Sequence, residues 1–362
     1  MRSVGVLTLG CKVNTYESEY ITHLLKEHGY QIKSFDDVCD VYIINTCTVT
    51  NTSDVKSRKM IRQAIKRNPD ACVVAAGCFI EANKDYTIPG LDIVIGNKDK
   101  SKIVELLEEY FTKKQEIRRL YKELPREFED MYINEFPGRT RAFVKIQDGC
   151  ENFCSYCIIP FVRGKCRSKD PDTVIKENPV IVNHLHIPLQ AGSNHVLRMM
   201  NRKYDLKYFK FRIQKIRKIR PDIAISTDVI VGFPGETGPD FSQTLETCEE
   251  LQFTKIHVFP YSERKGTVAK DLPYQVDKEV RRTRARMLLA LSKKLETNYF
   301  NTFIGKDVSV LIEEEKDGKS YGHTDNYLHV EIDKILPKNT FVTARITEVC
   351  YPYCIGEVSL LK

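Results

Sequence analysis

The stretch Asp148-Gly149-Cys150-Glu151-Asn152-Phe153-Cys154-Ser155-Tyr156-Cys157 governs the interpretation of the whole chain. It follows a β-branched segment, residues 142–147, and its Cys-x3-Cys-x2-Cys spacing places three thiols in one short loop. A closed zinc site normally takes four ligands, so three Cys fit zinc poorly. A four-iron cluster held by three Cys has one open iron, and that iron can chelate a small molecule. The spacing therefore favours an open iron–sulfur site over a zinc knuckle that lacks its fourth ligand.

These three cysteines belong to a set of twelve in a chain of 362 residues, of which 42% are hydrophobic and 29% are charged. Such a composition indicates a globular protein of two or three domains. No run approaches the roughly 18 apolar residues of a membrane span, and the N-terminus has no signal-peptide pattern. We therefore expect a cytoplasmic protein with no membrane contact. In that compartment, cysteines are metal ligands, catalytic thiols or buried apolar residues rather than disulfides.

Residues 1–100 alternate short β-branched runs with helical patterns, which predicts an open parallel α/β domain. A cysteine follows each of three predicted strands: Cys11, Cys47 and Cys78. The carboxyl ends of parallel strands meet at one edge of the sheet, where ligands bind. A lone cysteine at such a place is usually a small core residue, but here all three strands end this way. We expect these thiols to converge.

The other six cysteines have no comparable pattern, and we predict that they are structural or unassigned thiols. They are Cys39, Cys72, Cys166, Cys248, Cys350 and Cys354.

The remaining chain divides into three parts. Residues 101–138 are predicted to form a charged helical connector. Residues 139–300 alternate strands and helices again, with strands expected at the four segments 142–147, 184–190, 223–232 and 253–261. Residues 301–362 consist of short strands separated by turn signals, which predicts a small antiparallel β-barrel of a kind that binds oligonucleotides.

Together these features resemble the radical S-adenosylmethionine (SAM) methylthiotransferase family. The resemblance is carried by segments along nearly the whole chain, at residues 9–14, 45–50, 76–78, 149–164, 184–193, 200–202, 226–237 and 261–262. The form Gly-Cys-Lys-Val-Asn at residues 10–14 is similar to the branch that acts on N6-threonylcarbamoyladenosine in tRNA. The family implies an α/β fold in which a three-Cys domain precedes a (β/α)6 radical-SAM barrel and a TRAM domain.

The resemblance also implies two [4Fe-4S] clusters. Cys150, Cys154 and Cys157 would hold the cluster whose open iron binds SAM. The other three strand-end thiols would hold a second cluster, which carries the sulfur to be inserted. An electron from a reducing donor would then cleave SAM to a radical that removes hydrogen from C2 of the target adenine, in the anticodon loop.

Four residues at predicted strand or loop ends are candidate SAM contacts: Tyr156, Gln190, Asp228 and Pro260. His184 and His186 alternate along a strand, and we assign neither of them as a ligand. No Ser/His/Asp or paired-carboxylate arrangement suggests a general base. We expect a monomer.

Charge is unevenly distributed along the chain, although the net charge is only +7. Residues 198–220 hold ten basic side chains and one acid, residues 56–67 hold six and none, and residues 263–298 hold ten and five. Three such runs favour a phosphate-rich partner over solvated helix faces. Residues 303–362 carry a net charge of −3, so that barrel would bind tRNA with a local face. Its stacking candidates are Tyr321, Tyr327, Tyr351 and Tyr353.

The predicted radical-SAM barrel is too short. Only 26 residues separate Cys157 from the next strand at His184, and the four expected strands fall two short of six. Two βα units, roughly 60 residues, are absent near Glu177. Either a segment is missing from this sequence or the protein is shortened; we favour the first, because a barrel without two strands exposes its edges. The absent part would include SAM contacts, which puts SAM binding in doubt.

Two other functions stay open. The same chemistry could act on another tRNA adenosine or on a ribosomal-protein side chain, although the basic runs argue against a protein substrate. Alternatively, the short barrel could belong to a non-catalytic iron–sulfur protein that binds RNA.

Overall fold

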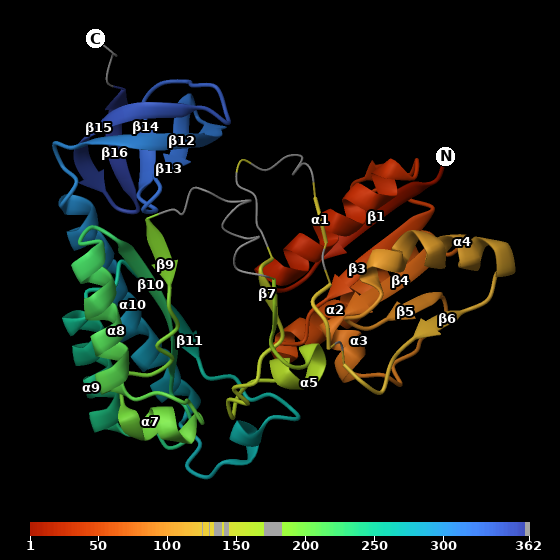
Figure 1. Cartoon of the computed structure of the whole chain (residues 1–362), viewed down its shortest axis with the longest axis horizontal. Coiled ribbons are helices and arrows are strands. Elements are labelled where there is room, and N and C mark those ends of the chain that lie inside the picture. The colour runs from red at the N-terminus through yellow and green to blue at the C-terminus, as the bar shows by residue number, and fades with distance from the viewer. Residues whose placement is uncertain (125, 130, 134–139, 141–144, 170–182, 359–362) are drawn as a thin grey trace. The chain divides into compact units, whose positions relative to one another are not determined.

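The fold was analysed in a computed structural model (Figure 1), which describes residues 1–362 except 125, 130, 134–139, 141–144, 170–182 and 359–362. The chain forms two compact units. The first comprises residues 1–177 and 262–270, and the second comprises residues 178–261 and 271–362.

A six-stranded parallel sheet forms the centre of the first unit. In sheet order its strands are β2 (Gln31–Lys33), β1 (Ser3–Thr8), β3 (Val41–Thr46), β4 (Cys72–Gly77), β5 (Ile93–Ile95) and β6 (Ile117–Arg119). β3 and β4 are buried along their whole length, as expected for central strands that helices cover on both faces. The predicted open parallel α/β domain is confirmed.

Helices pack on both faces of this sheet. α1 (Lys12–Glu27) and α4 (Ile103–Lys113) share one apolar core with it, whereas α2 (Asn51–Arg67) and α3 (Cys78–Ala82) share the other. Since β1 leads through α1 to β2 on one side, and β3 leads through α2 to β4 on the other, the chain reverses direction between β1 and β3. That point is the topological switch of a doubly wound sheet.

The predicted connector at residues 101–138 differs from the structure. In the described part of this segment only η1 (Lys100–Lys102) and α4 are helical, and Ile117–Arg119 adds a strand to the sheet. These residues form a strand because the apolar Ile117 is 7% exposed and packs in the same core as the residues of β5.

The first unit also contains the Cys150–Cys157 loop, followed by α5 (Ile159–Arg163). The strand predicted at residues 142–147 lies half outside the described residues; at its described end, β7 (Gln147–Asp148) pairs antiparallel with β8 (Arg167–Ser168). The predicted radical-SAM segment, residues 139–300, contributes to both compact units, and its extent as one domain stays a prediction.

The second unit contains a three-stranded parallel sheet and a small barrel. The sheet has the order β11 (Lys255–Pro260), β10 (Ala224–Val231) and β9 (His184–His186). Its helices are α7 (Asn194–Met199), α8 (Leu206–Ile219), α9 (Gly238–Glu250) and α10 (Lys278–Asn301), and α8, α9 and α10 lie along one side of the sheet (Figure 1). η2 (Val268–Asp271) spans the boundary between the units.

The C-terminal strands close on themselves. β12 (Asp307–Lys316), β13 (Lys319–His323), β14 (His329–Ile332), β16 (Tyr353–Val358) and β15 (Phe341–Cys350) form a closed barrel. Its pairings are antiparallel except that β14 and β16 run parallel. The prediction of a purely antiparallel barrel is therefore corrected at this one seam. Closure removes the exposed strand edges that an open sheet would have.

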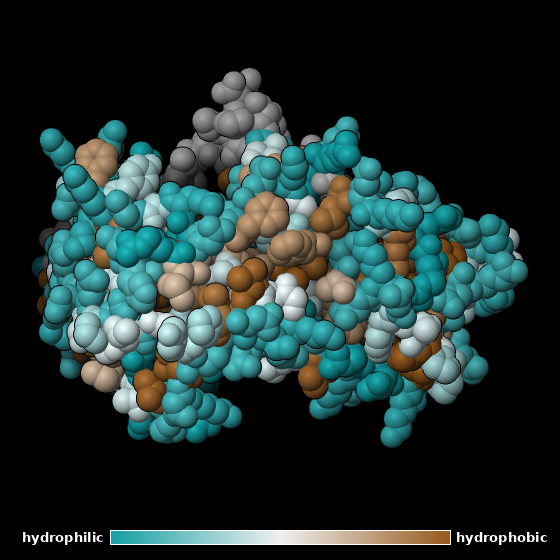
Figure 2. Space-filling model, turned by 90° about the horizontal axis from the view of Figure 1, so that it is seen from below, coloured by the Kyte–Doolittle hydropathy of each residue, from teal (hydrophilic) through white to brown (hydrophobic). Residues whose placement is uncertain are grey.

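No helix in the described part of the chain is long and apolar enough to cross a membrane. Large apolar side chains such as Phe161 and Phe211 are nevertheless more than half exposed. Figure 2 shows one face of the molecule, on which hydrophilic residues predominate and apolar residues occur in small groups.

The barrel core yields a first prediction. Ile346 on β15 is fully buried among the barrel's apolar residues, whereas Phe341 on the same strand is 72% exposed. Ile346→Ala leaves a cavity and should lower the free energy of unfolding by about 2–5 kcal/mol. Phe341→Ala should change it by less than about 0.5 kcal/mol. Urea denaturation compares the two, and equal effects would contradict the core assignment.

Candidate functional site

Three cysteines lie where three adjacent strands of the first sheet end. Cys11 follows β1, Cys47 follows β3 directly, and Cys78 follows β4 and begins α3. Cys11 and Cys47 therefore flank the topological switch point. Cys11 is exposed, whereas the other two are buried. The three residues thus follow neighbouring strands at one edge of the sheet, and the convergence of their thiols on one ligand stays a prediction.

Gly10 allows the chain to pass close to one of these thiols. Its φ is +106°, and a Cβ at this position would lie 2.8 Å from the Cys47 Sγ. Both the left-handed backbone and the short approach exclude a side chain. The Leu9-Gly10-Cys11 turn thus brings the Cys11 segment against the end of β3.

Two asparagines that the sequence analysis did not single out organise this edge. The Asn14 Nδ2 donates to the carbonyl oxygens of Leu9 and Thr46 at 2.7 and 2.9 Å, so it ties together the two strand ends. The Asn97 Nδ2 lies 3.4 Å from the Cys78 Sγ. Donors of this kind to sulfur tune iron–sulfur clusters. Asn14 belongs to the Gly-Cys-Lys-Val-Asn motif, but nothing in the sequence indicated that its side chain or that of Asn97 would contact the strand ends.

The second cysteine set lies in the loop that precedes α5. The Cys150 N–H donates to the Gly164 carbonyl at 2.9 Å, and the Cys157 N–H donates to the Cys154 carbonyl at 2.9 Å. The Cys157 Sγ in turn accepts from the Ile159 N–H at 3.4 Å. Cys154 is buried, and the other two cysteines are partly exposed. These bonds hold three sulfur atoms in one compact loop.

A buried network of charges connects the two sets within the first unit. The Glu17 carboxylate accepts from Arg163 at 2.9 Å and from Lys100, and all three side chains are at most 3% exposed. Burial alone would raise the pKa of Glu17, but Arg163 and Lys100 outweigh it and hold that pKa well below its usual range. Removing one partner of such a pair costs about 3–5 kcal/mol, because the other charge stays buried. Glu17 is therefore a carboxylate at neutral pH.

A second buried arginine contacts the residues that follow Cys47 at this edge. Arg264, in the segment 262–270, donates to the Thr48 hydroxyl, to Asp54 and to the Asn51 Oδ1 at 3.2 Å. It is 5% exposed. The segment following Cys47 is thereby bound to residues that lie more than 200 positions later in the chain.

The predicted SAM contacts occur in both units. Tyr156 lies in the loop of the second cysteine set, whereas Gln190, Asp228 and Pro260 lie in the second unit. Gln190 has a φ of +69° and exchanges backbone bonds with β10, donating to the Asp228 carbonyl at 2.8 Å. Pro260 ends β11.

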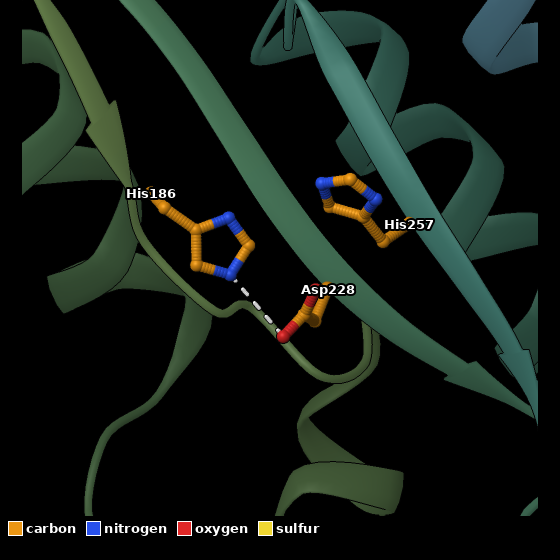
Figure 3. Close-up of side chains that lie close together, drawn as sticks. All are labelled: His186, Asp228 and His257. Atoms are coloured by element: carbon orange, nitrogen blue, oxygen red, sulfur yellow. Dashed lines mark ion pairs between the residues drawn. The ribbon is translucent and has the colours of Figure 1, made fainter. Parts of the chain in front are cut away.

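Asp228 is part of a cluster that the sequence analysis left out. His186, Asp228 and His257 come from the three strands of the second unit's sheet, and their ligand atoms lie within 4.8 Å of one another (Figure 3). The His186 Nε2 is 3.2 Å from Asp228, and its Nδ1 is 2.9 Å from the Ser226 hydroxyl. The cluster presents polar, ionisable groups to any molecule that contacts Asp228.

A row of rings crosses the C-terminal barrel. His184, Tyr327, His323, His329, Tyr353 and Tyr321 follow one another with ring centroids 4.2–6.0 Å apart. Three of the four predicted stacking tyrosines are in this row. The fourth, Tyr351, lies instead beside Lys293 and Glu296.

Comparisons with known proteins agree with these motifs. Residues 3–96 match an uncharacterized protein family, UPF0004, and residues 174–248 match the Radical SAM superfamily. The threonylcarbamoyladenosine tRNA methylthiotransferase MtaB of Bacillus subtilis (strain 168) is 36% identical over 99% of this chain and 96% of its own length. The chain belongs to the radical-SAM methylthiotransferase family, in the MtaB branch.

Two further comparisons have lower sequence identity. MtaB of Aquifex aeolicus (strain VF5) is 30% identical over 91% of this chain and 96% of its own length. A structure of the radical SAM methyltransferase TsrM from Kitasatospora setae, with cobalamin and a [4Fe-4S] cluster bound, aligns with a TM-score of 0.51. It is 11% identical, over 74% of this chain and 77% of TsrM, and so shows the fold alone.

The comparison also bears on the short barrel of this methylthiotransferase. The alignment with the Bacillus protein runs over 439 positions, although this chain has 362 residues. That relative therefore has at least 77 internal positions without a counterpart here. The difference accommodates the two βα units that the strand count finds absent. Their predicted place near Glu177 lies outside the described residues.

A radical SAM methylthiotransferase uses SAM and an iron–sulfur cluster, and the donors present fit such a cluster. Among the described residues, neither cysteine set has its three sulfur atoms within 4.8 Å of one another. Cysteines on one tetrahedral zinc ion lie closer, at roughly 3.8 Å for Zn–S bonds of about 2.3 Å. Three thiols with N–H donors nearby suit a multi-iron cluster better.

The close approach of Gly10 to Cys47, at the edge where β1, β3 and β4 end, yields a prediction about stability. A left-handed backbone alone costs an alanine about 1–2 kcal/mol. Gly10→Ala should lower the free energy of unfolding by more than this, because the new Cβ would also collide with the Cys47 Sγ. Gly29→Ala is the matched control, since Gly29 has a φ of +78° and open space around it. Denaturant unfolding of both variants is the measurement. Equal losses would show that the Cys47 approach is unimportant.

Proposed function

We propose that this protein is a tRNA methylthiotransferase that modifies C2 of N6-threonylcarbamoyladenosine beside the anticodon. The observation that carries the proposal is the presence of both cysteine sets in one unit of a chain that is 36% identical to MtaB of Bacillus subtilis along its length. Three basic runs supply the positive charge that a tRNA partner requires.

The proposal assigns two cluster sites. Cys150, Cys154 and Cys157 hold the cluster at which SAM binds, and the strand-end thiols hold a second cluster, which carries the sulfur. When bound, the first cluster supplies the electron for radical cleavage of SAM, chemistry that belongs to the cofactor. The chain's own groups orient these sites through Asn14, Asn97 and the Cys150 loop, with Tyr156, Gln190, Asp228 and Pro260 as SAM contacts.

The barrel β12–β16 is assigned as the TRAM domain that binds tRNA. Its net charge of −3 over residues 303–362 makes a general electrostatic attachment weak. The row of rings from His184 to Tyr321 is better suited, because nucleobases stack on aromatic side chains.

The short sheet of the second unit favours a second candidate function, a non-catalytic iron–sulfur protein that binds RNA. In the described part of this unit the parallel sheet has three strands, which fall short of the six of a complete radical-SAM barrel. Anaerobic reconstitution separates the two candidates. Two clusters without 5′-deoxyadenosine release from SAM would support the non-catalytic protein.

Nucleoside mass spectrometry tests the enzyme. A deletion strain should lose the methylthio form of N6-threonylcarbamoyladenosine, and the native gene should restore it. Cys47→Ala should not restore it, because the second cluster loses a ligand, whereas Cys39→Ala should, since Cys39 is equally buried but lies away from the strand-end edge. Unchanged methylthioadenosine species in the deletion strain would exclude this function.

The row of rings yields a binding prediction. Tyr353→Leu should weaken tRNA binding by about 1–3 kcal/mol through lost stacking. Phe341→Leu, on the exposed end of β15 and outside the row, should not weaken it. Filter binding at fixed salt measures both variants, and equal affinities would remove the ring row from the interface.

A further inference from the structure

The structure assigns a positioning role to the Glu17–Arg163 ion pair: it fixes the second cysteine loop to the strand-end edge and forms part of the environment of the cluster bound at Cys11, Cys47 and Cys78. This inference rests on the proposed function, which places a cluster at those thiols. Neither residue contacts substrate or ligates iron in this assignment.

The two residues come from opposite sides of the site. Glu17 lies on α1, the helix that begins directly after Cys11, and Arg163 ends α5, which follows the Cys150–Cys157 loop. Their side chains meet in two contacts, at 2.9 Å between Oε1 and Nη1 and at 3.3 Å between Oε2 and Nη2. Such paired contacts of a guanidinium with a carboxylate fix orientation as well as distance.

Arg163 extends from this pair to both cysteine sets. Its Nη2 donates to the Asn14 Oδ1 at 2.6 Å, and that asparagine ties the end of β1 to the end of β3. Its Nη1 donates to the Asp148 Oδ1 at 3.0 Å, two residues before Cys150. One side chain thus contacts the groups that place Cys11, Cys47 and Cys150.

Lys100 connects Glu17 to the end of β4, where Cys78 lies. That lysine donates to the Asn45 Oδ1 at 3.2 Å and to the Asn97 Oδ1 at 3.1 Å. Asn97 contacts the Cys78 Sγ and also donates to the Val162 carbonyl at 2.8 Å, next to Arg163. The network therefore returns to α5 and closes on itself.

A buried ion network is a poor source of stability, because dehydrating its charges offsets their attraction. What it supplies here is definite geometry, since each charge is satisfied only when α1, α5 and the strand ends adopt one arrangement. Groups around the ligands of a metal site commonly act in this way.

The test isolates the cluster at the strand ends. In a chain carrying Cys150→Ala, Cys154→Ala and Cys157→Ala, the only cluster that can form is the one at Cys11, Cys47 and Cys78. Any effect of changing Arg163 then reports on that cluster. Adding Arg163→Met should accelerate loss of the cluster to an iron chelator by roughly 10-fold or more. Arg163→Lys should restore part of the difference.

A second readout distinguishes a specific role from general loosening. Removing the positive charge with Arg163→Met should make the strand-end cluster harder to reduce, and removing the negative charge with Glu17→Gln should make it easier. The midpoint potential followed by electron paramagnetic resonance measures both shifts. Loosening of the fold would move both variants in the same direction, and that result would overturn the inference.

Arg284→Met is the matched control, because Arg284 pairs with the buried Glu236 in the other unit. It should leave both the chelation rate and the potential unchanged. The inference also fails if Arg163→Met leaves both unchanged while a cluster is present. If no cluster forms with Arg163 intact, the two-cluster proposal itself has failed, and the outcomes are thereby distinguishable. Thermal unfolding by circular dichroism verifies that each variant is folded.

Discussion

The arrangement of the first unit depends on one constraint: parallel strands that lie side by side end at the same edge of their sheet. β1, β3 and β4 are neighbours, and a cysteine follows each of them. Because the helices after β1 and β3 leave on opposite faces, the backbone separates at the switch point, where Gly10 allows close approach to Cys47. Three cysteines spread over almost 70 residues of sequence lie at one edge of the sheet for this reason.

Features that depend on local sequence were predictable. The β-branched runs, the strand-end cysteines and the Cys150 loop follow from spacing and periodicity. The Glu17–Arg163 pair was not, because it joins residues 146 positions apart and nothing in either local sequence signals the other. The short strand β6 was missed for a related reason: a three-residue strand exists only through pairing with its neighbour β5. The barrel seam between β14 and β16 likewise reflects tertiary pairing.

The second unit shows what a missing neighbour does to a strand. Among the described residues β9 pairs only with β10, and in the first unit the short strand β7 pairs antiparallel with β8. Sheet edges of this kind expose backbone hydrogen-bonding groups. The His186, Asp228 and His257 side chains point from the same sheet (Figure 3) and are partly or largely exposed. The at least 77 internal positions of the Bacillus protein that have no counterpart here exceed the roughly 60 residues of two βα units.

Arg264 adds an order of events during synthesis. All six candidate ligands lie within the first 157 residues, yet the arginine that binds Thr48 and Asp54 belongs to a segment that is made much later. At 5–20 residues per second, the ribosome needs about 4–17 s to proceed from residue 177 to residue 264. During this interval Thr48 and Asp54 on the nascent chain lack the arginine that they contact in the folded protein, so this part of the edge is completed after the rest of the first unit has been made.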